Sequence, residues 1–149
     1  MDHVTDCALC ERLASSVPPP GGWIYHGELW AVSAHPGVAA PGWLAVQTCR
    51  HVETLAELDT DEATSLGILL RDVSTRLQAA TGTDRTYTYA LGEGVRHVHM
   101  LVGVPLSQSN PADRGAQLLS RILARDPILE QPELRDHVCA AVAQAIRNG

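Results

Sequence analysis

The sequence predicts an α+β fold built on an antiparallel sheet, and three observations support this class. Short apolar-polar alternations typical of strands are separated by turn residues, and a long 3.6-residue apolar repeat follows them. The order is helix, strands, helix, hairpin, helices, without the β–α–β alternation of a parallel sheet. The chain has 149 residues, of which 45% are hydrophobic and 19% charged, as in an ordinary globular protein. We therefore expect a single domain over 1–149.

Each element has a local signal in the sequence. Asp59 followed by Glu62 is a helix cap with its N3 carboxylate, and Gly82 ends the apolar repeat that starts at Leu66. Tyr87, Tyr89 and Leu91 alternate with smaller residues, and a tight turn at 92–94 is expected to connect this strand to the next one. A short helix or turn is predicted at 7–16. The other predicted helices are 60–81, 113–125 and 132–147, and the predicted strands are 23–26, 29–33, 43–47, 85–91 and 95–104.

Charge and hydropathy exclude several classes of partner. A net charge of −6 argues against binding along a nucleic-acid backbone, which needs clustered Lys and Arg. No segment has the roughly 18 apolar residues of a membrane span, and Met1–Asp6 lacks the basic and apolar regions of a signal peptide. A cytoplasmic protein without nucleic-acid or membrane partners is expected. In that compartment, four cysteines are metal ligands or free thiols more readily than disulfides.

The stretch from His97 to Val102 places two histidines in an apolar run. In a strand, side chains alternate between faces, so His97, His99 and Leu101 are expected to share one face. Val98, Met100 and Val102 would then face the core. A neutral imidazole can act as a nucleophile toward phosphorus, and the backbone of 92–94 offers donors for phosphate oxygens. The alternative is that these are structural histidines held by backbone hydrogen bonds.

Cys7-x-x-Cys10 has the spacing of one half of a tetrahedral zinc site. His51, which follows a strand, and His97 are the preferred further ligands. The alternatives are ordinary reduced thiols, or a redox pair, although the β–α–β context of the latter is missing. Cys49 and Cys139 have no partner by spacing and are expected to be buried small hydrophobic residues.

Three blocks in one order give the chain a resemblance to a known family. They are Cys7-x-x-Cys10, then Pro41-Gly42 leading through a strand to Arg50-His51-Val52-Glu53, and then Gly92-x-x-Val95-x-His97-x-His99 before apolar residues. Over most of 7–105 the sequence resembles the histidine triad (HIT) superfamily of nucleotide hydrolases and transferases. The resemblance implies a five-stranded antiparallel sheet over this core and a homodimer. The helical C-terminal extension at 111–149, which its apolar spacing predicts, lies outside the strongest match.

Roles follow from the resemblance position by position. His99 matches the central histidine, which attacks the α-phosphorus and becomes nucleotidylated. In zinc-containing members the residues matching Cys7, Cys10, His51 and His97 ligate a structural zinc ion, which is the set that spacing favours. On a looser alignment, His35 falls where members carry a ribose-contacting Asn or Asp.

The signature is degenerate, because His-Val-His-Met-Leu replaces three alternating histidines. Leu101 stands at the third histidine, Gly94 at a Ser or Thr, Glu93 at a Gln, and Trp43 at the histidine after Pro-Gly. With His35, these are the expected substrate-binding positions. Losing one oxyanion donor typically costs about a hundredfold to a thousandfold in rate.

Three functional hypotheses therefore remain from the sequence. The first is an impaired or repurposed hydrolase or nucleotidyl transferase acting on a phosphoramidate or phosphoanhydride. The second is a domain that binds a nucleotide or another small molecule without standard hydrolysis. The third is a structural zinc domain that acts through protein contacts.

Overall fold

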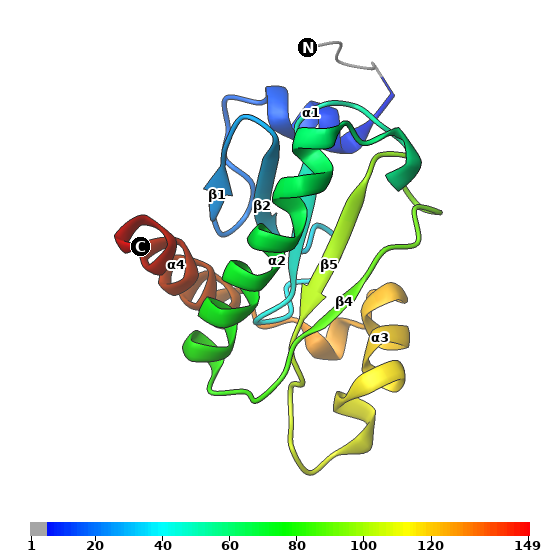
Figure 1. Cartoon of the computed structure of the whole chain (residues 1–149). Helices are drawn as coiled ribbons and strands as arrows, with labels where there is room; N and C mark the ends of the chain where they lie inside the picture. Colours follow the sequence, from blue (N-terminus) through cyan, green and yellow to red (C-terminus); the bar gives the residue numbers. More distant parts are fainter. Residues whose placement is uncertain (1–5) are drawn as a thin grey trace.

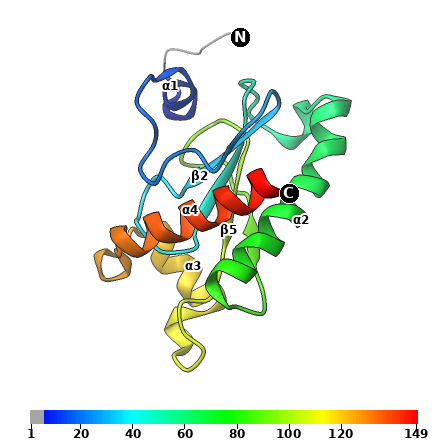
Figure 2. The same ribbon diagram turned by 90° about the vertical axis from the view of Figure 1, so that its left-hand side faces the viewer.

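A computed structural model describes residues 6–149, so the first five residues of the predicted domain lie outside the described part. Five strands form one antiparallel sheet in the order β1-β2-β3-β5-β4, and helices pack on both of its faces (Figures 1 and 2). The predicted α+β class and sheet are confirmed. The strands are β1 (Tyr25–His26), β2 (Trp30–Ala34), β3 (Leu44–Thr48), β4 (Tyr87–Tyr89) and β5 (His99–Gly103), and the α-helices are α1 (Ala8–Ala14), α2 (Thr60–Thr81), α3 (Gly115–Leu123) and α4 (Pro132–Asn148).

The helix α2 begins and ends where the sequence predicts. The Asp59 carboxylate accepts a hydrogen bond from the Glu62 amide at 2.8 Å, and the Glu62 carboxylate accepts one from the Asp59 amide at 2.9 Å. These two bonds satisfy donors that the first turn of a helix leaves without partners. Gly82 ends the helix with φ 70°, a left-handed conformation that glycine adopts without a Cβ clash.

Glu62 also fixes the segment that carries His51. Glu62 is buried, with 1% of the residue exposed, and its carboxylate accepts two hydrogen bonds from Arg50, at 3.0 and 2.8 Å. Replacing Glu62 by alanine should lower the free energy of unfolding by about 2–3 kcal/mol, because a cap and a charge-assisted bond are lost together. Urea unfolding measures this, with Asp61→Ala on the same helical turn as the matched control. Equal stability of the two variants would contradict the anchoring role.

The two faces of the sheet are covered by different helices. The helices α2 and α4 contact one another and pack on the face that carries Val32, Val46 and Val102, which forms the larger core. On the other face, α3 packs on Trp43, while the Leu9 carbonyl of α1 accepts a hydrogen bond from the side-chain Nε2 of Gln47. Figure 1 shows α2 running along the front of the sheet. The face with α1 and α3 is the face of His99 and Leu101.

The connection between β4 and β5 corrects the sequence prediction of a tight turn at 92–94. The register pairs Tyr89 with Leu101, so β5 begins at His99 and the loop 90–98 joins the strands. Val98 donates its amide to the Val52 carbonyl at 2.7 Å, which draws the end of this loop toward the His51 segment. His97 therefore precedes the strand, and the predicted strand 85–91 is shortened to three residues.

Both C-terminal helices form, at slightly shifted boundaries relative to 113–125 and 132–147. Leu118 and Ile122 of α3 are fully buried beside Trp43, and Val142 of α4 is fully buried in the larger core. The extension 111–149 thus completes both faces of the sheet. Within the described residues, every helix is too short or too polar to span a bilayer.

Candidate functional site

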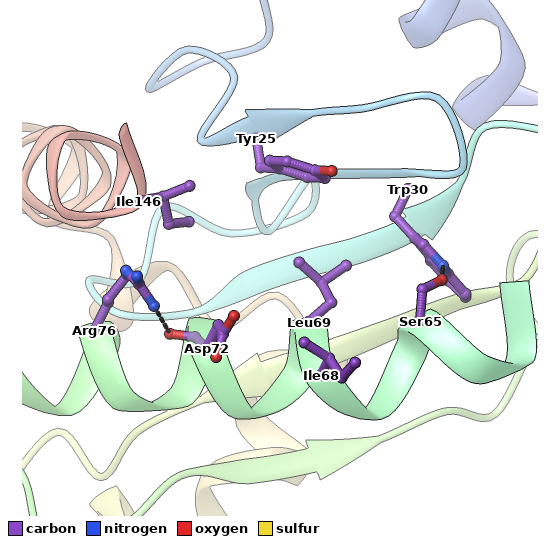
Figure 3. A pocket seen from close by; sticks show the side chains of 8 residues that line it. All are labelled: Tyr25, Trp30, Ser65, Ile68, Leu69, Asp72, Arg76 and Ile146. Carbon is purple, nitrogen blue, oxygen red and sulfur yellow. Dashed lines mark hydrogen bonds between the residues drawn. The ribbon is translucent and has the colours of Figure 1, made fainter. Parts of the chain in front are cut away.

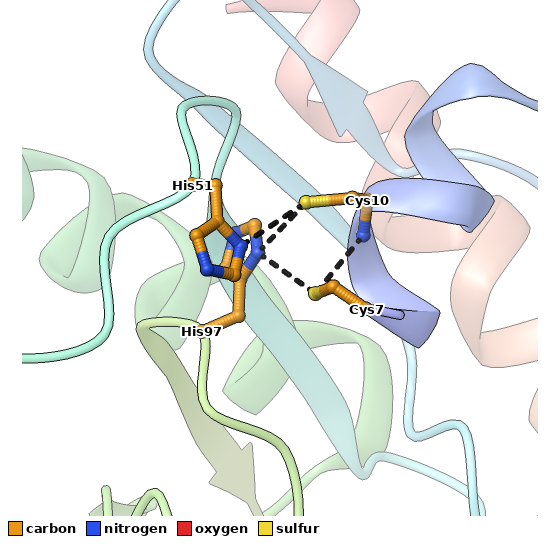
Figure 4. Close-up of side chains that lie close together, drawn as sticks. All are labelled: Cys7, Cys10, His51 and His97. Atoms are coloured by element: carbon orange, nitrogen blue, oxygen red, sulfur yellow. Dashed lines mark hydrogen bonds between the residues drawn. The ribbon is translucent and has the colours of Figure 1, made fainter. Parts of the chain in front are cut away.

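Two features lie near the start of β5: a cluster of cysteines and histidines, and a pocket lined by His99. Cys7 and Cys10 lie at the start of α1, and His51 and His97 lie on loops that follow β3 and precede β5 (Figure 4). One potential ligand atom from each of the four lies within 4.8 Å of the others. The structure therefore brings together the four residues that the sequence predicts as ligands.

The distances in this cluster fit a tetrahedral zinc site. The His97 Nδ1 atom is 3.4 Å from each cysteine sulfur, and the His51 Nδ1 atom is 3.3 Å from the Cys10 sulfur. Zn–N and Zn–S bonds of about 2.0 and 2.3 Å place tetrahedral ligand atoms roughly 3.3–3.8 Å apart. Two thiols and two imidazoles are also the donor set that zinc prefers. The cluster is a zinc site.

The orientation of His97 supports this assignment. Its Nε2 atom lies 2.8 Å from the Thr48 carbonyl oxygen, which can only accept, so Nε2 carries the proton. The Nδ1 lone pair then faces the two sulfurs. A hydrogen bond of this kind fixes the tautomer and the ring orientation of a metal-binding histidine. Burial lowers the pKa of His97, which also favours the neutral imidazole that a metal needs.

His99 lines a pocket of about 230 Å³. Its Nδ1 atom is 2.6 Å from the His97 carbonyl oxygen, so the proton lies on Nδ1 and the Nε2 lone pair is left available. His97, a residue of the metal cluster, thus orients the imidazole of His99 through its backbone carbonyl. Leu101, Glu93 and Gly94, three of the predicted substrate-binding positions, line the same pocket.

His35 lies between this pocket and a neighbouring hollow of about 340 Å³. Its Nδ1 atom accepts hydrogen bonds from the amides of Gly37 and Val38, at 2.9 and 3.2 Å. The Nε2 atom therefore carries the proton, and neutral His35 is a hydrogen-bond donor at its outer edge. This differs from the carboxylate or amide that the resemblance places at this position.

His35 should remain neutral throughout the physiological pH range. Burial, and then the charges of Arg125, His99 and Arg12, lower its pKa to about 4. The unfolded chain protonates this ring near pH 6.5, so His35 should cost no stability above that pH and increasingly destabilise the fold between pH 6.5 and 4. Nitrogen-15 NMR of labelled histidines should show an Nε2-protonated ring from pH 5 to 8. A midpoint near pH 6.5 would contradict it.

The position of Trp43 corrects one predicted contact. Its side chain is fully buried, packs beside Leu118 and Ile122, and donates from Nε1 to the Val104 carbonyl at 3.0 Å. The pocket of His99 is not lined by it. The residue after Pro41-Gly42 is therefore a core position in this chain, and Trp43 packs against the sheet instead of contacting a ligand.

The structure also places two arginines at the site that sequence reasoning missed. Arg125 follows α3 and lines the pocket of His99, while Arg12 in α1 lines the neighbouring hollow. Neither is near His99 in the chain, and neither belongs to a motif. Only the packing of α1 and α3 on this face reveals them.

A further hollow lies on the opposite face of the sheet, between the β1–β2 hairpin, α2 and α4 (Figure 3). Tyr25, Leu69 and Ile146 line it, and the Trp30 indole donates to the Ser65 hydroxyl at 3.0 Å. None of the residues predicted to be functional lies there. His99 and the pocket that it lines are on the other face of the sheet.

Comparisons with known proteins agree on the fold. No protein-family model matches this sequence, and a search of curated proteins finds no match. Among solved structures, a hypothetical histidine triad nucleotide-binding protein from Sulfolobus tokodaii is 20% identical with a TM-score of 0.69, and the match covers 95% of this chain and 93% of that one. A zinc-bound histidine triad family protein from Mycobacterium smegmatis is 14% identical with a TM-score of 0.67, covering 97% and 98%. A HIT-like protein involved in cell-cycle regulation from Bartonella henselae is 11% identical with a TM-score of 0.68, covering 97% and 99%.

The chain therefore has the histidine triad fold, and the resemblance drawn from its motifs is confirmed at that level. These three matches extend over nearly the whole chain, including most of the C-terminal extension. The zinc site is assigned from the distances and the donor set in this chain, independently of the zinc-bound neighbour.

Proposed function

We propose that the protein is a nucleotide hydrolase or nucleotidyl transferase that acts on a phosphoramidate or phosphoanhydride through His99. The observation that carries this proposal is the hydrogen bond from His99 Nδ1 to the His97 carbonyl, which leaves Nε2 unprotonated on a side chain that lines the pocket. An oriented neutral imidazole beside a cavity is the arrangement that nucleophilic catalysis requires. The histidine triad fold, shared with a neighbour named as nucleotide-binding, supports the nucleotide class.

In the proposed reaction, His99 Nε2 attacks the α-phosphorus and forms an N–P bond. The P–N or P–O bond to the leaving group breaks, and the leaving group takes a proton from a water molecule. The hydroxide that remains then attacks phosphorus and breaks the N–P bond, which releases the nucleoside monophosphate and restores neutral imidazole. Zinc supplies structural stability here, by holding the loop whose carbonyl orients His99.

The experiment is a turnover panel with the zinc-loaded protein. Adenosine phosphoramidate and dinucleoside polyphosphates are incubated with it, and release of the monophosphate is followed by chromatography. Turnover of either class that requires His99 supports the proposal. Absence of turnover across the panel contradicts it.

A second proposal is binding without standard hydrolysis, and Leu101 is the observation that favours it. Its side chain lines the pocket beside His99 with 6% exposure and offers no hydrogen bond to a phosphate oxygen. Calorimetric titration with adenosine monophosphate discriminates the two proposals. Tight binding with no turnover of the panel supports the second.

We further propose that the chain works as a cytoplasmic homodimer, as the resemblance implies. The strand β4 lies at an edge of the sheet in the described part, with β5 as its one strand partner, so a second chain has access to it. Light scattering after size-exclusion chromatography tests the stoichiometry. A monomer at micromolar concentration would contradict it.

A further inference from the structure

Arg125 occupies an unusual backbone position at the end of α3. Its φ is +54°, and it is the one non-glycine residue with positive φ in the described part of the chain. The Arg125 amide donates to the Ile122 carbonyl at 3.1 Å, and the Asp126 amide donates to the Arg121 carbonyl at 3.0 Å. This pair of bonds defines a helix end at which glycine is the usual residue. An arginine there is strained, and such strain is often found at functional sites.

The side chain of Arg125 reaches the pocket of His99. A Cβ atom added to Gly37 would lie 2.9 Å from His35 Cε1 and 3.0 Å from Arg125 Nε, so both side chains surround the same point. Only glycine leaves room for this approach. No carboxylate in the described residues forms an ion pair with Arg125 within 4.0 Å. Its charge is therefore available to a ligand.

A second guanidinium group strengthens the positive potential from the other side. Arg12 lines the hollow that shares His35 and Gly37 with this pocket, and its Nη1 donates to the Ser33 hydroxyl at 3.2 Å. It also lacks a carboxylate partner among residues 6–149. Burial lowers the pKa of Arg12.

We propose that Arg125 binds the anionic phosphoryl group of the ligand that His99 faces. The inference rests on the proposed function for the presence of a ligand in this pocket, and it specifies that ligand as a phosphate ester or phosphoric amide rather than a neutral nucleoside. Arginine replaces the hydrogen-bond donors that are absent at Leu101, Gly94 and Glu93. A guanidinium can bind two phosphate oxygens at once, and His35 Nε2–H provides a neutral donor beside it.

The test compares Arg125→Gly, Arg125→Lys and the matched control Arg71→Gln, an exposed arginine of α2 on the opposite face that pairs with Asp72. Calorimetry measures the affinity for adenosine monophosphate, adenosine and inorganic pyrophosphate. Arg125→Gly should lower the affinity for the two anions at least about tenfold, since charge-assisted bonds are lost. Its affinity for adenosine should stay within twofold of the wild type. Arg125→Lys should retain part of the affinity, and Arg71→Gln should match the wild type.

Stability provides an independent readout of folding. Glycine relieves the positive φ, so Arg125→Gly should melt about 2–4 °C above the wild type even though it binds anions less tightly. A destabilised variant would contradict the assignment of this backbone position. If Arg125→Gly is at least as stable as the wild type, loss of the fold cannot explain its weaker anion binding.

The outcomes separate this inference from the proposed function. Pyrophosphate binding that depends on Arg125, in a protein that binds no nucleotide, would confirm the arginine and contradict the nucleotide proposal. Anion binding that is unchanged in Arg125→Gly would overturn the inference while leaving the nucleotide proposal intact. A wild-type protein that binds no phosphate-containing anion would overturn both.

Discussion

Replacement of His99 by glycine should reduce turnover by at least about 10⁴-fold, because loss of a nucleophile removes the covalent route entirely. The affinity for the monophosphate should change far less, since the anion contacts lie elsewhere in the pocket. Added imidazole should restore part of the turnover, because it can occupy the space that the missing ring leaves. Steady-state assays with and without imidazole measure both effects.

The control for this prediction is His99→Gln, which keeps a polar side chain of similar length at the start of β5. It should fold, retain zinc and remain inactive with or without imidazole. Turnover within tenfold of the wild type in either variant would show that another group acts as the nucleophile. Rescue of His99→Gln by imidazole would equally contradict the proposed use of the empty space.

Removal of zinc is expected to have the largest effect on stability. Cys7, Cys10, His51 and His97 join α1 to two loops, so the metal cross-links segments that are far apart in the sequence. Zinc present at about 1,000 times its dissociation constant contributes about 4 kcal/mol to folding. For a chain of this size, chelation should then lower the melting temperature by about 8–16 °C. Calorimetry before and after treatment with a chelator measures the change.

Cys10→Ser should reproduce the effect of chelation, and chelator should then change its stability little further. Cys49→Ala is the matched control, because Cys49 is also buried but lies outside the metal cluster, and its sulfur donates to the Gly27 carbonyl at 3.4 Å. This control should hold one zinc per chain and respond to chelator like the wild type. Elemental analysis that finds no metal in the wild type would contradict the zinc site.

The parts of the fold that the sequence predicts well are those with local causes. The Asp59–Glu62 capping box and Gly82 bound α2 within a residue, because caps act on neighbouring backbone groups. Alternation places Leu101 and His99 on one face correctly. The tight turn after Tyr89 is wrong, since the loop is set by the hydrogen bond of Val98 to Val52 in a distant segment.

The residues of the site likewise include some with a local signal in the sequence and some that only packing places. The zinc ligands have a spacing signal in Cys7 and Cys10, and the pocket residues near His99 belong to its own strand and loop. Arg125 has no such signal, because its place in the pocket of His35 and His99 depends on how α3 packs on the sheet. Trp43 is wrong as a ligand contact because the motif gives its position in the chain, whereas packing against Leu118 buries it.

The most direct test of the central claim is the covalent intermediate itself. The zinc-loaded protein is mixed with adenosine phosphoramidate, quenched without acid, and digested for peptide mass spectrometry. One adenylyl group on His99 of the wild type, and none on any histidine of His99→Gln, is the predicted result. An adduct on His35 or His51, or turnover without any adduct, would contradict the role assigned to His99.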